Sequence, residues 1–190
     1  MQSSKLNKFI VLEGISGSGK TEIGTRLAEC ISAQYYTTPP ALFRNLREEA
    51  DKSLCVEARF LFYLSSVVQA SWEIGKILET QSVVCDKYIW STICYHSVFG
   101  INIDLPLLNV YRQPDYVFLI VCDEEKRLER LRVRRLRSNG RFVVDKEKYN
   151  RRQEMERRCL IEFRKYIQSE IDNTPDGPYN AVGQILANMK

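Results

Sequence analysis

The stretch that decides the fold is Phe9-Ile10-Val11-Leu12-Glu13-Gly14-Ile15-Ser16-Gly17-Ser18-Gly19-Lys20-Thr21. Its apolar start predicts a buried strand over residues 8–13, and the apolar spacing after it predicts a helix over about 21–32. The glycine-rich turn between them fits the pattern G-x-x-x-x-G-K-[ST], whose fixed positions are Gly14, Gly19, Lys20 and Thr21. A strand, such a turn and a helix in this order predict a phosphate-binding loop.

This loop carries the chemistry of a nucleotide site. Glycines let the backbone curl so that successive N–H groups point at phosphate oxygens, and the helix N-terminus adds its positive dipole end. The amides concerned belong to Ser16, Gly17, Ser18 and Gly19. Lys20 can reach the β- and γ-phosphates of ATP, and the Thr21 hydroxyl can ligate Mg²⁺. The alternative, a glycine-rich turn beside a surface lysine, leaves the flanking strand and helix unexplained.

The composition indicates an ordinary globular protein. The 190 residues suffice for a single domain spanning 1–190. The net charge of +4 suits an anionic substrate but does not imply nucleic acid, so we expect small-molecule nucleotides as partners. The sequence has no run of about 18 apolar residues that would cross a membrane and no apolar core typical of a signal peptide. A cytoplasmic location is therefore expected.

The cysteines also indicate a reducing compartment. They form no C-x-x-C pair, and His96 is the single histidine, which argues against a zinc site. Several lie in apolar runs, so we interpret them as reduced core thiols of an intracellular protein. The six are Cys30, Cys55, Cys85, Cys94, Cys122 and Cys159.

Strand and helix patterns alternate along the rest of the chain. Strands are expected at 35–37, 82–86 and 116–122. Helices are expected at 41–51, 56–80, 89–99, 104–111, 124–137, 145–169 and 179–188, with a break at 138–140 and a loop at 173–178. This order predicts an α/β fold, a three-layer sandwich with a central parallel sheet and helices on both faces. The apolar face of 56–80 is so wide that most of its side chains, including Leu61, Val68 and Trp72, are expected in the core.

A second functional segment follows the strand 82–86. Because ligands bind at the carboxyl ends of the strands in such sheets, Gly14 and Asp86 should face one cleft. Asp86 can hold Mg²⁺ through water or orient the attacking phosphate, and Lys87 beside it can hold a substrate phosphate. The alternative, that Asp86 only caps the next helix and Lys87 is solvated, is disfavoured by the phosphate-binding loop.

With these segments the chain resembles the thymidylate kinase family of P-loop nucleoside monophosphate kinases over nearly its whole length. The matching segments are 9–21 for the opening strand and loop, Asp86-Lys87-Tyr88 with Ser91 and Tyr95 for the Asp-Arg-Tyr signature, 57–62 for the base-stacking helix, and 114–130 for the strand and helix before the lid. The resemblance implies a P-loop kinase that moves the γ-phosphoryl group of Mg-ATP to thymidine monophosphate or a related deoxynucleotide. It also implies a homodimer.

The resemblance assigns roles to individual residues. Lys20 and Asp86 belong to the catalytic centre, Thr21 and Asp86 hold the metal, and Arg130 joins the ATP site. The residues implied at the acceptor are Arg47 and Lys87 for its phosphate, Phe62 for stacking on the base, and Ser66, Ser91 and Tyr95 around them.

Several departures from the family pattern fall on the acceptor site. Lys87 replaces the signature arginine, which keeps the charge but loses the bidentate fork. Ser66 stands where the family has an arginine that reads the thymine edge, and His96 stands where glutamine is common. Thr38-Pro39-Pro40 replaces an acidic-proline-glycine loop. The phosphate-transfer parts are kept, and the base-reading parts are altered.

Residues 127–141 contain seven arginines. A basic helix is usually a solvated face or a weak polyanion patch. Phosphoryl transfer, however, needs positioned cations, and the phosphate-binding loop carries no arginine. We therefore predict a lid over approximately 132–144 that excludes water on closing, with Arg134 and Arg141 acting in catalysis.

Two classes of function remain open at this stage. The favoured one is an ATP- and Mg²⁺-dependent nucleoside monophosphate kinase, with a kinase for a nucleoside or another small metabolite as a variant. The other is a nucleotide- or RNA-binding protein without catalysis, whose nucleic-acid binding would depend steeply on salt. The retained Lys20, Thr21 and Asp86 argue against it.

The base is open as well. Ser66 is short and neutral, so it cannot span the gap that an arginine would fill. The chain is then either a poorer thymidylate kinase than its relatives or prefers another acceptor, unless another residue replaces the lost donor. The candidates are Gln69, about one turn further on, and the Pro39-Pro40 loop.

Overall fold

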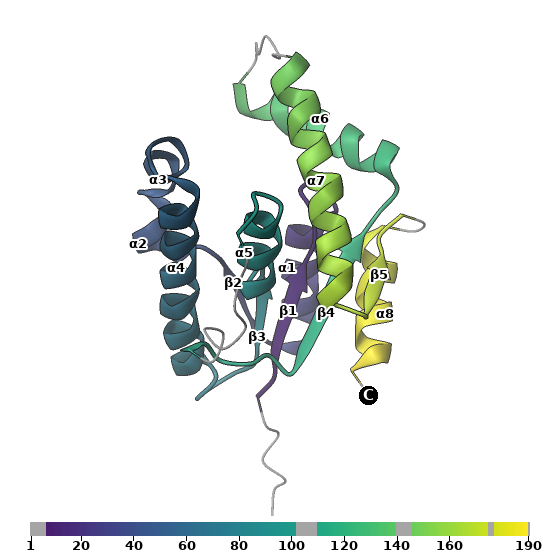
Figure 1. The fold of residues 1–190 in the computed structure, drawn as a ribbon. Coiled ribbons are helices and arrows are strands. Elements are labelled where there is room, and N and C mark those ends of the chain that lie inside the picture. The colour runs from purple at the N-terminus through teal and green to yellow at the C-terminus, as the bar shows by residue number, and fades with distance from the viewer. Residues whose placement is uncertain (1–6, 102–109, 140–145, 175–176, 190) are drawn as a thin grey trace, which may run out of the picture.

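The computed structural model describes residues 7–101, 110–139, 146–174 and 177–189. A five-stranded parallel sheet, in the order β2-β3-β1-β4-β5, lies between two layers of helices, as the sequence predicts (Figure 1). The strands are β1 (Phe9–Glu13), β2 (Gln34–Thr37), β3 (Val83–Asp86), β4 (Tyr116–Val121) and β5 (Glu170–Asp172). The helices are α1 (Lys20–Ile31), α2 (Ala41–Arg44), α3 (Arg47–Ser53), α4 (Val56–Ile77), α5 (Ile89–Ser97), α6 (Glu124–Asn139), α7 (Lys146–Tyr166) and α8 (Pro178–Asn188).

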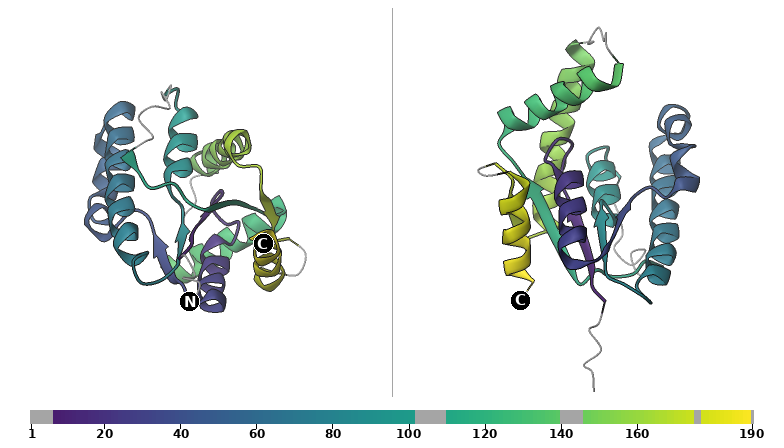
Figure 2. Two further views of the ribbon diagram at one scale, coloured as in Figure 1. Left: turned by 90° about the horizontal axis from the view of Figure 1, so that it is seen from below. Right: turned by 180° about the vertical axis from the view of Figure 1, so that it is seen from behind.

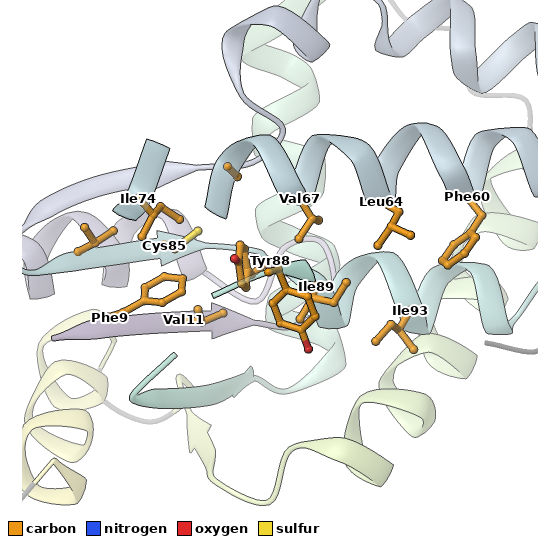
Figure 3. Close-up of a cluster of buried hydrophobic side chains, with 13 residues drawn as sticks. Phe9, Val11, Phe60, Leu64, Val67, Ile74, Cys85, Tyr88, Ile89 and Ile93 are labelled. Carbon is orange, nitrogen blue, oxygen red and sulfur yellow. The ribbon is translucent and has the colours of Figure 1, made fainter. Parts of the chain in front are cut away.

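The central strand β1 is buried along its whole length, and its alternating side chains enter two cores. Phe9 and Val11 pack with α4 and α5 on one face, where Figure 3 shows α4 side chains pointing at α5. Ile10 and Leu12 pack with α1 and α8 on the other face, which Figure 2 shows from behind. Burial on both faces explains why the strand reads as an unbroken apolar run.

The topology opens a crevice at one edge of the sheet. The connection after β1 leads to β2 on one side, and the connection after β3 leads to β4 on the other. The backbone therefore diverges beyond the carboxyl ends of β1 and β3, where ligands bind in folds of this kind. The helices α6 and α7 extend beyond the same end of the sheet (Figure 1).

Some local predictions were wrong. The helix expected at 41–51 is split into α2 and α3, and α6 continues through Asn139 instead of ending at the predicted break. The strand β5 was not predicted, because its single buried residue, Ile171, stands between two charged ones. The predicted helix 104–111 lies largely outside the described residues.

Two predictions about burial were also wrong. Leu61, Val68 and Trp72 of α4 are exposed, because α4 presents the row Phe60, Leu64, Val67 and Ile74 to the sheet and α5. Cys30 and Cys55 are exposed rather than core residues, whereas Cys85, Cys94 and Cys159 are buried and all six thiols are free. Within the described ranges, no helix is both long and apolar enough to cross a membrane.

The buried carboxylate of Glu13 joins the end of β1 to the start of α5. One oxygen accepts the backbone N–H groups of Tyr88 (2.9 Å) and Ser91 (3.1 Å), and the other accepts the Ser91 hydroxyl at 2.6 Å. Burial raises the pKa of Glu13, while these hydrogen bonds lower it. A carboxylate from β1 thus satisfies amides that open α5 and fixes the helix against the sheet.

Replacing Glu13 with alanine should therefore destabilise the fold. We expect the free energy of unfolding to fall by about 2 kcal/mol or more, because buried amides lose their acceptor. Glu13→Gln should lose less, since an amide oxygen still accepts. Urea unfolding followed by circular dichroism measures both, with Glu22→Ala on the exposed face of α1 as the control. Equal stability of the alanine and glutamine variants would contradict this role of Glu13.

Candidate active site

The phosphate-binding loop adopts a shape that glycine alone tolerates at two points. Gly14 has φ 142° and Gly19 has φ 97°. A Cβ on Gly14 would lie 2.5 Å from the carbonyl oxygen of Ile120. A Cβ on Gly19 would lie 2.2 Å from the side-chain nitrogen of Asn173. The loop therefore needs glycine for both conformation and space, as its motif predicts.

Lys20 lies at the centre of this loop with only 5% of its surface exposed. Its ammonium donates hydrogen bonds to the Ile15 carbonyl (2.8 Å) and the Ser18 hydroxyl (3.1 Å). Burial lowers the pKa of Lys20 to about 8, and the nearby Lys87 charge acts in the same direction. An anion bound at the loop would supply the countercharge that this ammonium lacks.

Thr21 and Asp86 meet beside the loop. The Thr21 hydroxyl donates to Oδ2 of Asp86 at 2.8 Å, and the Tyr35 hydroxyl donates to the same oxygen at 3.0 Å. The other oxygen, Oδ1, is buried without a hydrogen-bond partner among the described residues. A hydroxyl and a carboxylate with a free oxygen are ligands that suit Mg²⁺. The described residues contain no cluster of three or more His, Cys, Asp or Glu side chains that could hold a metal alone.

Two arginines support the loop from outside. The Arg127 side chain is buried, and it donates to the Ser16 carbonyl at 3.1 Å and to the Gln153 side chain at 2.6 Å. Arg130 donates to the Ser18 carbonyl at 3.3 Å, and Asn173 donates to the same carbonyl at 2.9 Å. These arginines of α6 therefore do not form a freely solvated basic face. They fix the peptide planes of the loop.

A cavity of about 380 Å³ opens from the loop toward α4 and α5. Near the loop its lining includes Ser16, Lys87, Ser91, Tyr95, Arg152 and Glu156. Lys87 has φ 68°, a left-handed conformation that is strained for lysine, and its ammonium lies 5.6 Å from the centre of the Tyr95 ring. The strained backbone turns this cation toward the cavity end that adjoins the loop.

A buried carboxylate connects this cavity to the loop. Glu156 of α7 accepts the backbone N–H of Ser16 at 3.0 Å and the Tyr95 hydroxyl at 2.7 Å. These hydrogen bonds hold the pKa of Glu156 below its usual value although burial acts in the opposite direction. Ser91 and Tyr95 thus lie at the cavity as predicted, but the Ser91 hydroxyl is engaged by Glu13 and the Tyr95 hydroxyl by Glu156.

The far end of the cavity differs from the prediction. The row Arg59, Tyr63, Ser66 and Val67 of α4 lines it, whereas Phe62 is not among its described lining residues. Phe62 instead packs its ring on Phe43 and Tyr63. The resemblance assigned base stacking to Phe62, but the aromatic side chain of α4 that lines the cavity is that of the next residue, Tyr63.

Other residues predicted at this end form hydrogen bonds with neighbouring side chains. Arg47 lines the cavity and donates to the Tyr63 hydroxyl at 3.1 Å, and that hydroxyl donates to Asp51 at 2.8 Å. Gln69 donates to Glu73 at 2.9 Å and is not among the described lining residues. Thr38 and Pro39 do line the cavity.

The predicted lid residues lie outside the cavity or outside the described chain. Arg134 is exposed on α6 and is not among the described lining residues. Arg141 lies outside the described residues, as do parts of the predicted lid over 132–144.

Sequence reasoning missed Arg59, Tyr63, Arg152 and Glu156. For Arg59 and Tyr63 a signal existed, because positions 59, 63 and 66 share one face of a helix with the predicted reading position. No comparable signal marks Arg152 and Glu156, because charged residues surround both in the sequence of α7.

This geometry joins a phosphate-binding loop to a cavity that has the cations Lys87 and Arg152 at its near end, and comparison with known proteins agrees with it. The model of the thymidylate kinase family matches residues 12–174. The chain belongs to the thymidylate kinase family. It is accordingly an ATP-dependent nucleoside monophosphate kinase, and its substrates are small nucleotides, as the sequence predicted.

Individual thymidylate kinases extend this likeness over most of the chain. A probable thymidylate kinase of Methanocaldococcus jannaschii is 31% identical over 175 residues, covering 88% of this chain and 93% of that protein. One of Methanococcus vannielii is 37% identical over 134 residues, 68% of each chain. The crystal structure of thymidylate kinase from Ehrlichia chaffeensis has a TM-score of 0.73 at 21% identity, covering 97% of this chain and 99% of that one. The Candida albicans thymidylate kinase structure has a TM-score of 0.70 at 17% identity, covering 96% and 91%. The two structures support the fold.

The lowered pKa of Lys20 predicts that ATP binding depends on pH. Below its pKa of about 8 the ammonium is charged in the free protein, and it loses its proton as the pH rises. If the charged form alone binds phosphates, the dissociation constant of Mg-ATP should rise about tenfold between pH 7 and pH 9.

Calorimetry in buffers of different ionisation enthalpy measures this linkage. We expect proton uptake on Mg-ATP binding at pH 9 and much less at pH 7, with no uptake in Lys20→Met. A binding constant and proton balance that stay constant over this range would contradict the perturbed Lys20.

Proposed function

We propose that this chain transfers the γ-phosphoryl group of Mg-ATP to the 5′-phosphate of thymidine monophosphate. One observation carries the proposal: the buried Lys20 and the Thr21–Asp86 pair adjoin a cavity that has cations at its near end and aromatic side chains at its far end. The family to which the chain belongs supports the same acceptor.

In this proposal the chain's residues position two phosphate groups. Lys20 and the loop amides hold the β- and γ-phosphates of ATP, while Lys87 and Arg152 draw the acceptor phosphate into the cavity. Thr21 and Asp86 would hold Mg²⁺, which neutralises charge on the transferred group when bound. The free Oδ1 of Asp86 supports this assignment. Tyr63 stacks on the base in place of the expected Phe62.

Replacing Lys20 with methionine tests the function directly. The variant keeps the stem and removes the charge from the phosphates, so kcat should fall by about 10²-fold or more. A coupled assay of ADP formation with thymidine monophosphate measures it, and circular dichroism checks the fold. Near-normal turnover in Lys20→Met would reject the assigned donor site.

We also propose that the segment over approximately 132–144 closes as a lid and brings Arg134 to the transferred group. Arg134→Ala should then lower kcat about 10-fold or more with little change in the KM for ATP, since the contact forms in the transition state. Arg164→Ala, an exposed arginine in the last turn of α7, is the control. A change in KM alone would show that Arg134 binds ground-state nucleotide.

Two further parts of the proposal concern the protein as a whole. We propose a homodimer, supported by the row Leu61, Val68 and Trp72, which lies exposed on one side of α4. We propose a cytoplasmic location, supported by ATP and nucleotide monophosphates as substrates.

A further inference from the structure

The position that should read the base has no free donor. Ser66 is 2% exposed, and its hydroxyl donates to the Tyr63 carbonyl at 2.7 Å. A hydroxyl has one proton to donate, and here the helix backbone accepts it. Ser66 therefore lines the cavity but leaves a base edge without a hydrogen-bond donor at this point.

Arg59 supplies the missing donors from the same helix. It lies two turns before Ser66 on the face of α4 that lines the cavity, and its guanidinium carbon lies 4.9 Å from the centre of the Phe99 ring. Within the described residues the Arg59 side chain forms no hydrogen bond or ion pair. A guanidinium has five N–H donors and no acceptor, so this residue offers the cavity donors alone.

His96 supplies a matching acceptor from α5, which packs beside α4 (Figure 3). It is 4% exposed, lines the cavity, and has Nδ1 2.7 Å from the Thr92 carbonyl. Because a carbonyl oxygen only accepts, Nδ1 carries the ring proton and Nε2 is left with a lone pair. Within the described residues Nε2 has no hydrogen-bond partner.

The electrostatic surroundings keep this ring neutral. Burial lowers the pKa of His96, and the Arg59 charge lowers it further, while the Thr92 carbonyl and Asp51 act in the opposite direction. Arg59 and His96 both line this cavity. One wall of the cavity thus offers donors beside a fixed acceptor.

We propose that Arg59 and His96 together read the base of the acceptor nucleotide, with Arg59 donating to a base carbonyl and His96 Nε2 accepting the neighbouring ring N–H. This inference rests on the proposed function, because it names the recognition element of the acceptor site. Thymine and uracil carry this pair of groups at O4 and N3–H. Cytosine carries an amino group and a bare N3 there, so both contacts would be lost and two lone pairs would face each other.

The selectivity for thymidine over deoxycytidine monophosphate tests the pair. The wild-type chain should prefer thymidine monophosphate by at least about 10²-fold in kcat/KM, since buried polar groups reject an edge that leaves them unpaired. Arg59→Met should lower kcat/KM for thymidine monophosphate about 10- to 100-fold through KM, and leave the KM for ATP unchanged. His96→Gln can both donate and accept, so it should relax the preference.

Lys76→Met is the matched control, because Lys76 is a cation of the same helix lying 5.8 Å from the centre of the Trp72 ring, away from the cavity. It should retain the wild-type preference. A preference below about threefold in the wild-type chain, or one unchanged in both Arg59→Met and His96→Gln, would overturn the assignment.

Calorimetric binding of the two monophosphates without ATP separates this proposal from the proposed function. If no phosphate is transferred to any acceptor but thymidine monophosphate still binds more tightly and loses this advantage in Arg59→Met, the base reading stands and the catalytic assignment fails. If transfer occurs without discrimination, the catalytic assignment stands and the base reading fails.

Discussion

The site depends on keeping a curled run of backbone amides in place without bound phosphate. Where an N–H group of the loop points inward, the carbonyl of the same peptide group points outward. A buried carbonyl without a hydrogen-bond donor destabilises the fold. Arg127, Arg130 and Asn173 bind the carbonyls of Ser16 and Ser18 from outside. The Glu156 carboxylate in turn accepts the Ser16 amide. Side chains of α6, of α7 and of the residue that follows β5 therefore hold the loop ready for an anion.

The same constraint links the donor and acceptor sites. Glu156 contacts the loop through Ser16 and the acceptor cavity through Tyr95, and Glu13 joins the end of β1 to the start of α5. Lys20 and Lys87 repel one another, which contributes to the lowered pKa of Lys20. An acceptor phosphate beside Lys87 would offset this repulsion and so favour the charged form of Lys20, which ATP binding needs.

The sequence predicted the phosphate-binding loop and the sheet because their causes are local. An apolar strand, glycines with positive φ and a lysine at a fixed offset need only neighbouring residues to be recognised. Other features depend on which elements pack against them, so local sequence patterns predicted them wrongly. These are the exposed face of α4, the split of 41–51 into two helices, and the short strand β5.

The acceptor site was predictable only in part. Ser91 and Tyr95 lie at the cavity because their spacing puts them on one face of α5, and Lys87 lies there because it directly follows β3. Tyr63 replaces Phe62 there because the rotation of α4 is set by the fit of Phe60, Leu64 and Val67 against α5, which no local pattern contains. The roles of Arg127 and Glu156 depend on their contacts with Ser16, which precedes them in the chain by 111 and 140 positions respectively.

The central claim is that the loop and the cavity form one continuous site for two nucleotides joined through their phosphates. Binding of adenosine and thymidine linked by five phosphates, measured by calorimetry against ATP and thymidine monophosphate alone, tests it most directly. One molecule that fills both sites should bind at least about 100-fold more tightly than either nucleotide. Binding no tighter than that of ATP would show that the two sites are not continuous and would contradict the account.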